Sequence, residues 1–178
     1  MKKLKNKDLQ RITVKEFKSA EKTPITIVLD NVRSALNVGA IFRTSDAFLI
    51  ENIILCGITR IPPNKEIRKV ALGATNSVNW KFEKNTLNAV SKLKQDGYYI
   101  MSIEQADKSS KLNNFTLPKK PLAIIMGNEV NGVSEDVINI SDEVMEIPQF
   151  GTKHSLNISV TTGIVVWELW RKLQESNS

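Results

Sequence analysis

Short runs of apolar residues, many of them β-branched, recur along this chain and are separated by segments with helical periodicity. A glycine, a proline or polar residues close each run, a pattern typical of strands buried on both faces of a sheet. The runs predict strands at residues 25–29, 53–56, 80–82, 98–101, 122–126 and 144–147. The periodic segments predict helices at residues 13–20, 38–48, 87–94 and 157–173, and a short helix that starts at Ser134. Residues 58–78 and 104–121 show neither pattern, so we expect loops there.

Strands that alternate with helices predict an α/β domain with a parallel sheet. In such sheets, ligands bind beyond the carboxyl ends of the strands. The loops that follow Leu29, Met101, Met126 and Ile147 are therefore where we expect functional residues. The chain shows no internal repeat, low-complexity tract or linker, and its 178 residues fit one domain of ordinary size.

The loop after the first predicted strand opens a helix that carries an arginine among small and apolar residues. Asn37 and Gly39 stand at the start of this helix, and Arg43 follows nearly two turns later. A guanidinium in such surroundings is costly unless it has an anionic partner. The partner is either a bound anion, as in a functional site, or a neighbouring acid such as Asp46, which would make Arg43 part of a structural ion pair.

A second loop places polar residues between two glycines at the end of a strand. Gly127 and Gly132 flank a turn that includes Glu129. Glycines permit positive φ and a close approach of the backbone to a ligand. The simpler alternative is a strand-to-helix turn that Ser134 caps.

The third loop runs from Ile147 to Asn157 and opens the last helix. Ser155 and Asn157 are candidates to cap that helix, and its N-terminus also favours an anion; capping alone is the simpler interpretation. His154 stands beside Ser155, but adjacent side chains do not readily point at each other and no acid orients the imidazole. We therefore do not expect a serine nucleophile here.

Composition excludes several classes of protein. One Cys and one His are too few for a disulfide framework or a Cys/His zinc cage. The sequence has no G-x-G-x-x-G after its first strand, no G-x-x-x-x-G-K-[ST] phosphate loop and no acidic cluster suited to magnesium. No apolar run approaches the ~20 residues of a membrane span, and no apolar stretch of a signal peptide follows the basic N-terminus. We expect a cytoplasmic protein without a metal.

Basic residues are concentrated at the N-terminus. Residues 1–22 hold eight Lys or Arg and three acids, and so account for +5 of the net charge of +6. We divide the chain into a basic arm with a short helix, residues 1–23, and one domain, residues 24–178. Such an arm suits a polyanion, most simply a nucleic acid, or it is a solubilising tail.

The last predicted helix, residues 157–173, is apolar nearly all round. Such a helix should be buried on two sides. It either packs between the core and a second copy of the chain or lies centrally in the core of one chain. We interpret Trp80, Trp167 and Trp170 as packing residues rather than as platforms for bases.

Taken in order, the three loops resemble the three motifs of the SpoU/TrmH family of RNA ribose 2′-O-methyltransferases, within the SPOUT superfamily. The resemblance covers roughly residues 24–174. One mild departure is Thr161-Thr162, where the family often has small Ala residues. The motifs are N-x-G-x-x-x-R at Asn37, Gly39 and Arg43; G-x-E-x-x-G at Gly127, Glu129 and Gly132; and Ile147-Pro148 followed by Ser155-Leu156-Asn157.

The resemblance implies a fold, a cofactor and a reaction. Residues 24–178 would form a methyltransferase domain with the parallel-sheet SPOUT fold, and the second and third loops would form its C-terminal trefoil knot. S-adenosylmethionine would bind in the knot against Gly127, Ile147 and Leu156. The enzyme would methylate a ribose 2′-hydroxyl of tRNA or rRNA without a metal. It would act as a homodimer with the active site near the interface.

The resemblance also gives the key catalytic position to Arg43. Because an arginine has a pKa above about 12 and resists deprotonation, we expect Arg43 to grip a phosphate and stabilise the forming alkoxide rather than act as the base. Asn37, Glu129, Ser155 and Asn157 would orient Arg43 and the ribose. Two alternatives stay open: a non-catalytic RNA-binding or assembly protein with this fold, and a SPOUT enzyme that methylates a base.

Overall fold

The structure, a computed structural model, describes residues 1–5 and 8–176, so Lys7 of the basic arm lies outside the described residues. Within them, seven strands form one sheet in the order β3-β2-β1-β6-β4-β7-β5, and every strand pair is parallel. The predicted α/β class with a parallel sheet is confirmed. In chain order the strands are β1 Thr23–Asp30, β2 Ile50–Cys56, β3 Trp80–Glu83, β4 Tyr99–Ile103, β5 Ser110–Lys111, β6 Leu122–Met126 and β7 Glu143–Glu146.

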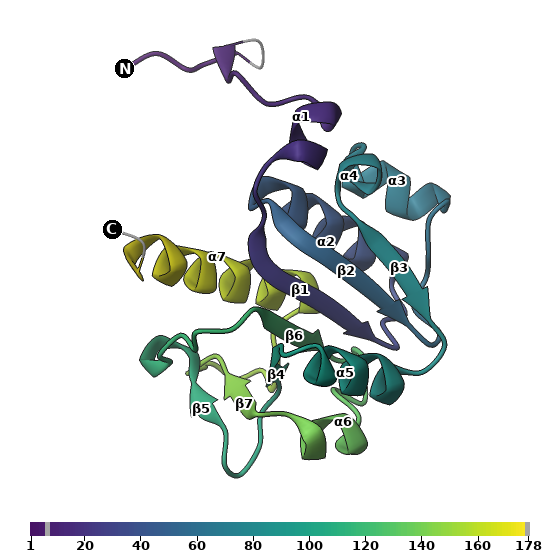
Figure 1. The fold of residues 1–178 in the computed structure, drawn as a ribbon, viewed down its shortest axis with the longest axis vertical. Coiled ribbons are helices and arrows are strands. Elements are labelled where there is room, and N and C mark those ends of the chain that lie inside the picture. The colour runs from purple at the N-terminus through teal and green to yellow at the C-terminus, as the bar shows by residue number, and fades with distance from the viewer. Residues whose placement is uncertain (6–7, 177–178) are drawn as a thin grey trace.

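Helices cover both faces of the sheet (Figure 1). α1 to α4 and α7 pack on one face, and α5 and α6 pack on the other. A short 3₁₀ helix, η2, follows β5. The helices are α1 Val14–Ser19, α2 Ala35–Ala47, α3 Lys65–Ala71, α4 Ala74–Ser77, α5 Thr86–Gln95, η2 Leu112–Asn114, α6 Glu135–Ile140 and α7 Ile158–Ser176.

Coverage on both faces explains why the strands are continuous apolar runs. Ile27 and Leu29 of β1 point to the core under α2 and α7, whereas Val28 between them points to the core under α5 and α6. All three side chains are fully buried. β1 therefore has no polar face, as parallel strands under two helical layers require.

The prediction of a loop over residues 58–78 is wrong, because α3 and α4 lie there. Asn64 caps α3 by accepting hydrogen bonds from the backbone amides of Glu66 and Ile67. Ile67 and Ala74 from these helices are buried in the core against α2. Helices of seven and four residues are too short to show periodicity, and the preceding Pro62-Pro63 suggested a loop.

Residues 104–121 are mostly loop, as predicted, but they add β5 and η2. β5 pairs with β7 over only two residues, Ser110 and Lys111, so it has no recognisable alternation. Elsewhere the predicted strands and helices are present, with ends that differ by at most three residues. Thr13 and Glu16 form a capping box at the start of α1, where the predicted helix begins.

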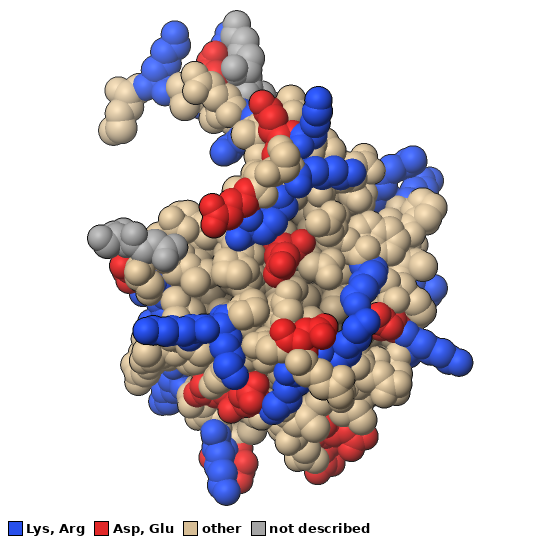
Figure 2. Space-filling view, in the orientation of Figure 1, with Lys and Arg blue, Asp and Glu red and all other residues tan. Residues whose placement is uncertain are grey.

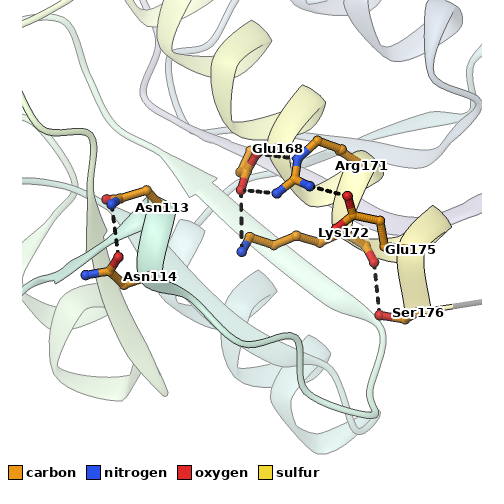
Figure 3. Close-up of polar contacts among 7 residues, drawn as sticks. All are labelled: Asn113, Asn114, Glu168, Arg171, Lys172, Glu175 and Ser176. Atoms are coloured by element: carbon orange, nitrogen blue, oxygen red, sulfur yellow. Dashed lines mark hydrogen bonds and ion pairs between the residues drawn. The ribbon is translucent and has the colours of Figure 1, made fainter.

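α7 buries one side against the sheet and leaves an apolar stripe exposed. Val165, Val166 and Leu169 are fully buried, but Val160 and Trp167 are each 51% exposed. Trp167 and Trp170 contact each other and Phe48, in agreement with a packing role. The last turns of α7 carry ion pairs from Arg171 to its helical neighbours (Figure 3).

Residues 1–5 and 8–13, before α1, extend away from the domain (Figure 1). Only Phe17 of α1 enters the core, whereas Leu4 and Ile12 are exposed. On the face shown in Figure 2, blue basic side chains stand out on this arm, and charges of both signs are mixed over the rest. None of the described helices is long and apolar enough to cross a bilayer.

Candidate functional site

The three motif loops meet at the carboxyl edge of the sheet and are joined by hydrogen bonds between side chains. The amide of Asn157, just before α7, donates to Asn37 Oδ1 at 3.2 Å. The amide of Asn37, in the first turn of α2, donates to Glu129 Oε1 at 3.1 Å in the loop after β6. We call this series the Asn157–Asn37–Glu129 relay. It links one residue from each motif.

The carboxylate of Glu129 also binds the backbone where α2 begins. It accepts from the amide N–H groups of Arg33 at 2.9 Å and Ser34 at 3.0 Å. Partial desolvation alone would raise the pKa of Glu129, but the hydrogen bonds from these amides and from Asn37 outweigh it and hold the pKa below its ordinary value. Glu129 is therefore an anion at neutral pH that fixes the first loop to the second.

Asn157 has two functions at once. Its Oδ1 accepts from the N–H of Ser159 at 2.9 Å, which caps α7, while its amide nitrogen reaches Asn37. The predicted capping of α7 by Asn157 is confirmed, and the residue also contacts Asn37 of the first motif. Ser134, in contrast, occupies the N-cap position of α6 without a capping hydrogen bond from its side chain.

A hollow of about 420 Å³ lies beside the relay, between the second and third loops. The three positions predicted to contact a cofactor all line it, and so does Ser155. Its volume is within the range of small-molecule sites, and its floor is apolar, with Met126, Met145 and Ile158. The predicted lining residues are Gly127, Ile147 and Leu156.

The second loop turns back on itself tightly enough to require glycine at two positions. Asn128 and Gly132 exchange two backbone hydrogen bonds of 2.9 Å. A Cβ on Gly127 would stand 2.2 Å from the carbonyl carbon of Gly132 and the nitrogen of Val133. Gly132 has a φ of +67°. The edge of the hollow is therefore backbone, which a cofactor can approach closely.

Arg43 does not join the other site residues within one chain. It lies about 120° around α2 from Asn37 and does not line the 420 Å³ hollow. Its side chain is exposed and has no hydrogen bond or ion pair among the described residues. The alternative of a pair with Asp46 is wrong, since Asp46 accepts from the hydroxyl of Ser77 instead.

Two acids at the ends of strands support the second loop, and the sequence analysis missed both. Glu104, after β4, accepts from the N–H of Val133 at 3.0 Å. Asp30, which ends β1 and is 2% exposed, accepts from the N–H of Ser134 and from the hydroxyl of Thr86. Their only signal was their place directly beyond apolar strands.

No group of three metal-ligating side chains occurs within residues 1–5 and 8–176. The hollow offers backbone groups, apolar side chains, side-chain amides and the separate carboxylates of Glu104, Glu129 and Glu146. These suit a flat, partly apolar organic cofactor better than an ion. S-adenosylmethionine fits this donor set.

The model of the SpoU rRNA methylase family matches residues 24–167. The tRNA (guanosine(18)-2′-O)-methyltransferase of Borreliella burgdorferi is 31% identical over 86% of this chain and 69% of its own. Among solved structures, the TrmH/SpoU tRNA modifying enzyme of A. aeolicus has a TM-score of 0.82 at 26% identity, over 92% of this chain and 84% of its own. The AdoMet-bound rRNA methyltransferase from Sinorhizobium meliloti has a TM-score of 0.80 at 28% identity. The match covers 88% of this chain and 60% of that protein.

This chain belongs to the SpoU rRNA methylase family. The family predicted from the three motifs is thereby confirmed.

Proposed function

We propose that this protein transfers the methyl group of S-adenosylmethionine to a ribose 2′-hydroxyl of tRNA or rRNA. The Asn157–Asn37–Glu129 relay carries the proposal, because it joins all three motifs beside a hollow with the lining predicted for the cofactor. Relatives that act on tRNA and on rRNA, including one whose structure contains AdoMet, support the same reaction.

Gly127, Ile147 and Leu156 would hold the cofactor, largely through backbone groups and apolar contact. When bound, S-adenosylmethionine supplies an electrophilic methyl group on a sulfonium. Metal chemistry has no part in the proposal, because the hydroxyl needs only alignment and loss of its proton.

The relay and Ser155 orient the ribose, so that its 2′-oxygen stands within attack distance and in line. Glu129 keeps Asn37 in one rotamer, and Asn37 in turn positions Asn157. Arg43, always charged, grips a phosphate of the RNA and stabilises the developing alkoxide.

We also propose a homodimer that completes this site. Val160, Ile164 and Trp167 form a stripe on α7, and Leu36 of α2 is 49% exposed. α2 packs against α7, and Leu36 and Arg43, seven residues apart, share one face of α2. A second copy that covers both the stripe and Leu36 would therefore also meet Arg43. Sedimentation should give a dimer, and Trp167→Arg should give a monomer.

The dimer makes a further test of Arg43 possible. If Arg43 serves the site of the other copy, then Arg43→Ala and Asn157→Ala chains expressed together regain activity that neither has alone. If both residues serve the same site, the mixture stays inactive.

The remaining features follow from the family. We propose that the second and third loops form a trefoil knot, since both line one hollow at one sheet edge. Residues 24–178 are the methyltransferase domain, the basic arm contacts RNA, and the protein works in the cytoplasm with its substrates. A backbone trace of an experimental structure, closed between the termini, decides whether the chain is knotted.

The test of function is methyl transfer from labelled S-adenosylmethionine to unmodified tRNA and rRNA transcripts, followed by nucleoside analysis. We expect label in 2′-O-methylated nucleosides. Label in a base would identify the alternative SPOUT chemistry, and RNA binding without any transfer would identify a non-catalytic binding protein.

A further inference from the structure

A second hollow, of about 800 Å³, adjoins the site on the far side of the second loop from the cofactor residues. It is shared by the loops after β1, β2 and β6. Glu129 and Val130 line both hollows, so the two are neighbours. We call this one the Arg33–Arg60 hollow; its lining residues are Arg33, Ser34, Ile58, Arg60, Glu129 and Val130.

Two guanidinium groups line this hollow without an anionic partner among residues 1–5 and 8–176. The side chains of Arg33 and Arg60 are exposed and make no hydrogen bond or ion pair among the described residues. Glu129 lines the same hollow but forms no ion pair with either guanidinium; its carboxylate accepts from two backbone amides and Asn37. Free guanidinium forks at the border of a hollow suit phosphate oxygens.

The same hollow presents apolar side chains to solvent on a fixed backbone. Ile58 is 62% exposed and Val130 is 74% exposed. The N–H of Ile58 donates to Asn31 Oδ1 at 3.1 Å, and the N–H of Val130 donates to Asn128 Oδ1 at 2.9 Å. The side-chain amide of Asn128 donates to the backbone carbonyl of Asn31 at 2.6 Å. This hydrogen bond joins the loop after β6 to the loop after β1.

We propose that the Arg33–Arg60 hollow binds a nucleotide of the RNA next to the one that is methylated. Its phosphate lies on Arg33 and Arg60, and its base lies against Ile58 and Val130. This proposal rests on the proposed function, and it adds a subsite outside the three motifs. Positive charge beside exposed apolar walls matches a phosphate joined to a base, and the shared Glu129 places that nucleotide beside the acceptor ribose.

The test uses the full chain with Arg33→Gln and Arg60→Gln together, and Lys92→Gln as the control. Lys92 is exposed on α5 and lines neither hollow. Its substitution removes a positive charge without changing this surface. Binding of an unmodified tRNA transcript pool is measured against salt, together with single-turnover methylation and the affinity for S-adenosylmethionine.

We expect the double variant to bind the transcripts about tenfold more weakly and to flatten the plot of log affinity against log salt by about 0.7–0.9, as loss of one phosphate contact requires. Its rate at saturating RNA and its cofactor affinity should stay near those of the wild type. If the RNA affinity and the salt slope equal those of Lys92→Gln, the hollow does not bind RNA and the proposal is overturned.

A second readout does not depend on charge. Transcripts that contain 4-thiouridine should crosslink to the peptides with Ile58 or Val130, and Ile58→Ser should reduce that yield. Crosslinks confined to other surfaces would overturn the subsite. If the wild type binds RNA here but methylates none, the proposed function fails while the subsite stands, so the two failures are distinguishable.

Discussion

The side-chain amide of Asn157 donates to Asn37 Oδ1 at 3.2 Å, although 120 residues separate them in the chain. The side-chain amide of Asn37 in turn donates to Glu129, which also accepts from two backbone amides at the start of α2. Three short motifs thus behave as one polar unit, and a change in one of them should displace the other two.

Asn37→Ala should separate the first loop from the third. We expect the rate of methyl transfer to fall about 10²-fold, because the ribose loses its alignment, while cofactor affinity changes little. Single-turnover rates and calorimetry measure the two quantities. Asn88→Ala, at an exposed position on α5, is the matched control. Equal rates for the two variants would show that the relay does not align the ribose.

Gly127→Ala should act on the cofactor instead. The new Cβ would stand 2.2 Å from backbone atoms of Gly132 and Val133, so the second loop must move. We expect affinity for S-adenosylmethionine to drop about tenfold or more, equivalent to about 1.4 kcal/mol. In contrast, Gly163→Ala in α7 meets no atom within 4 Å and should leave the affinity unchanged. Normal cofactor binding by Gly127→Ala would contradict the assignment of the hollow.

How much the sequence predicts depends on the length of each signal. The strand at 122–126 was predictable because five buried apolar residues stand together between a proline and a glycine. α3 and α4 were not, because helices of seven and four residues are stabilised by their contacts with α2 rather than by a visible pattern. The predicted elements therefore match the structure best where a continuous run of apolar residues is buried.

The same holds for the site. That the three loops meet was predictable, since the carboxyl ends of parallel strands share one edge. The contact from Asn157 to Asn37 was not, because it depends on side-chain rotamers across the sheet edge. Arg43 was expected among the other site residues, yet it points away from Asn37 on α2. Its spacing of six residues along a helix already implied an offset of about 120°, which the motif pattern by itself does not make evident.

The lowered pKa of Glu129 makes a prediction about acid stability. A carboxyl whose folded-state pKa lies below its unfolded value of about 4.5 stabilises the fold above that value, and the contribution is lost as the pH falls through the folded-state pKa. Between pH 6 and pH 3 the wild type should lose more stability than Glu129→Gln does. Denaturant unfolding at several pH values measures this. Parallel curves for the two proteins would show that Glu129 is not held as an anion.

The basic arm should contribute to RNA affinity but not to cofactor binding. If three to five of its charges touch phosphates, replacement by Gln should reduce the slope of log RNA affinity against log salt by about 2–4. An unchanged slope would mean that the arm is a solubilising tail. Glutamine removes the charge but keeps a polar side chain at each position, and Phe17 still anchors α1 in the core. The replaced residues are Lys2, Lys3, Lys5, Lys7, Arg11 and Lys15.

The most direct measurement maps ribose 2′-O-methylation in the RNA of cells that have this protein, lack it, or carry only Arg43→Ala. We predict that at least one site in tRNA or rRNA loses its methyl group when the protein is absent and stays unmethylated with Arg43→Ala. That variant should still bind S-adenosylmethionine, since Arg43 does not line the cofactor hollow. Identical maps in the three cell lines would contradict the account.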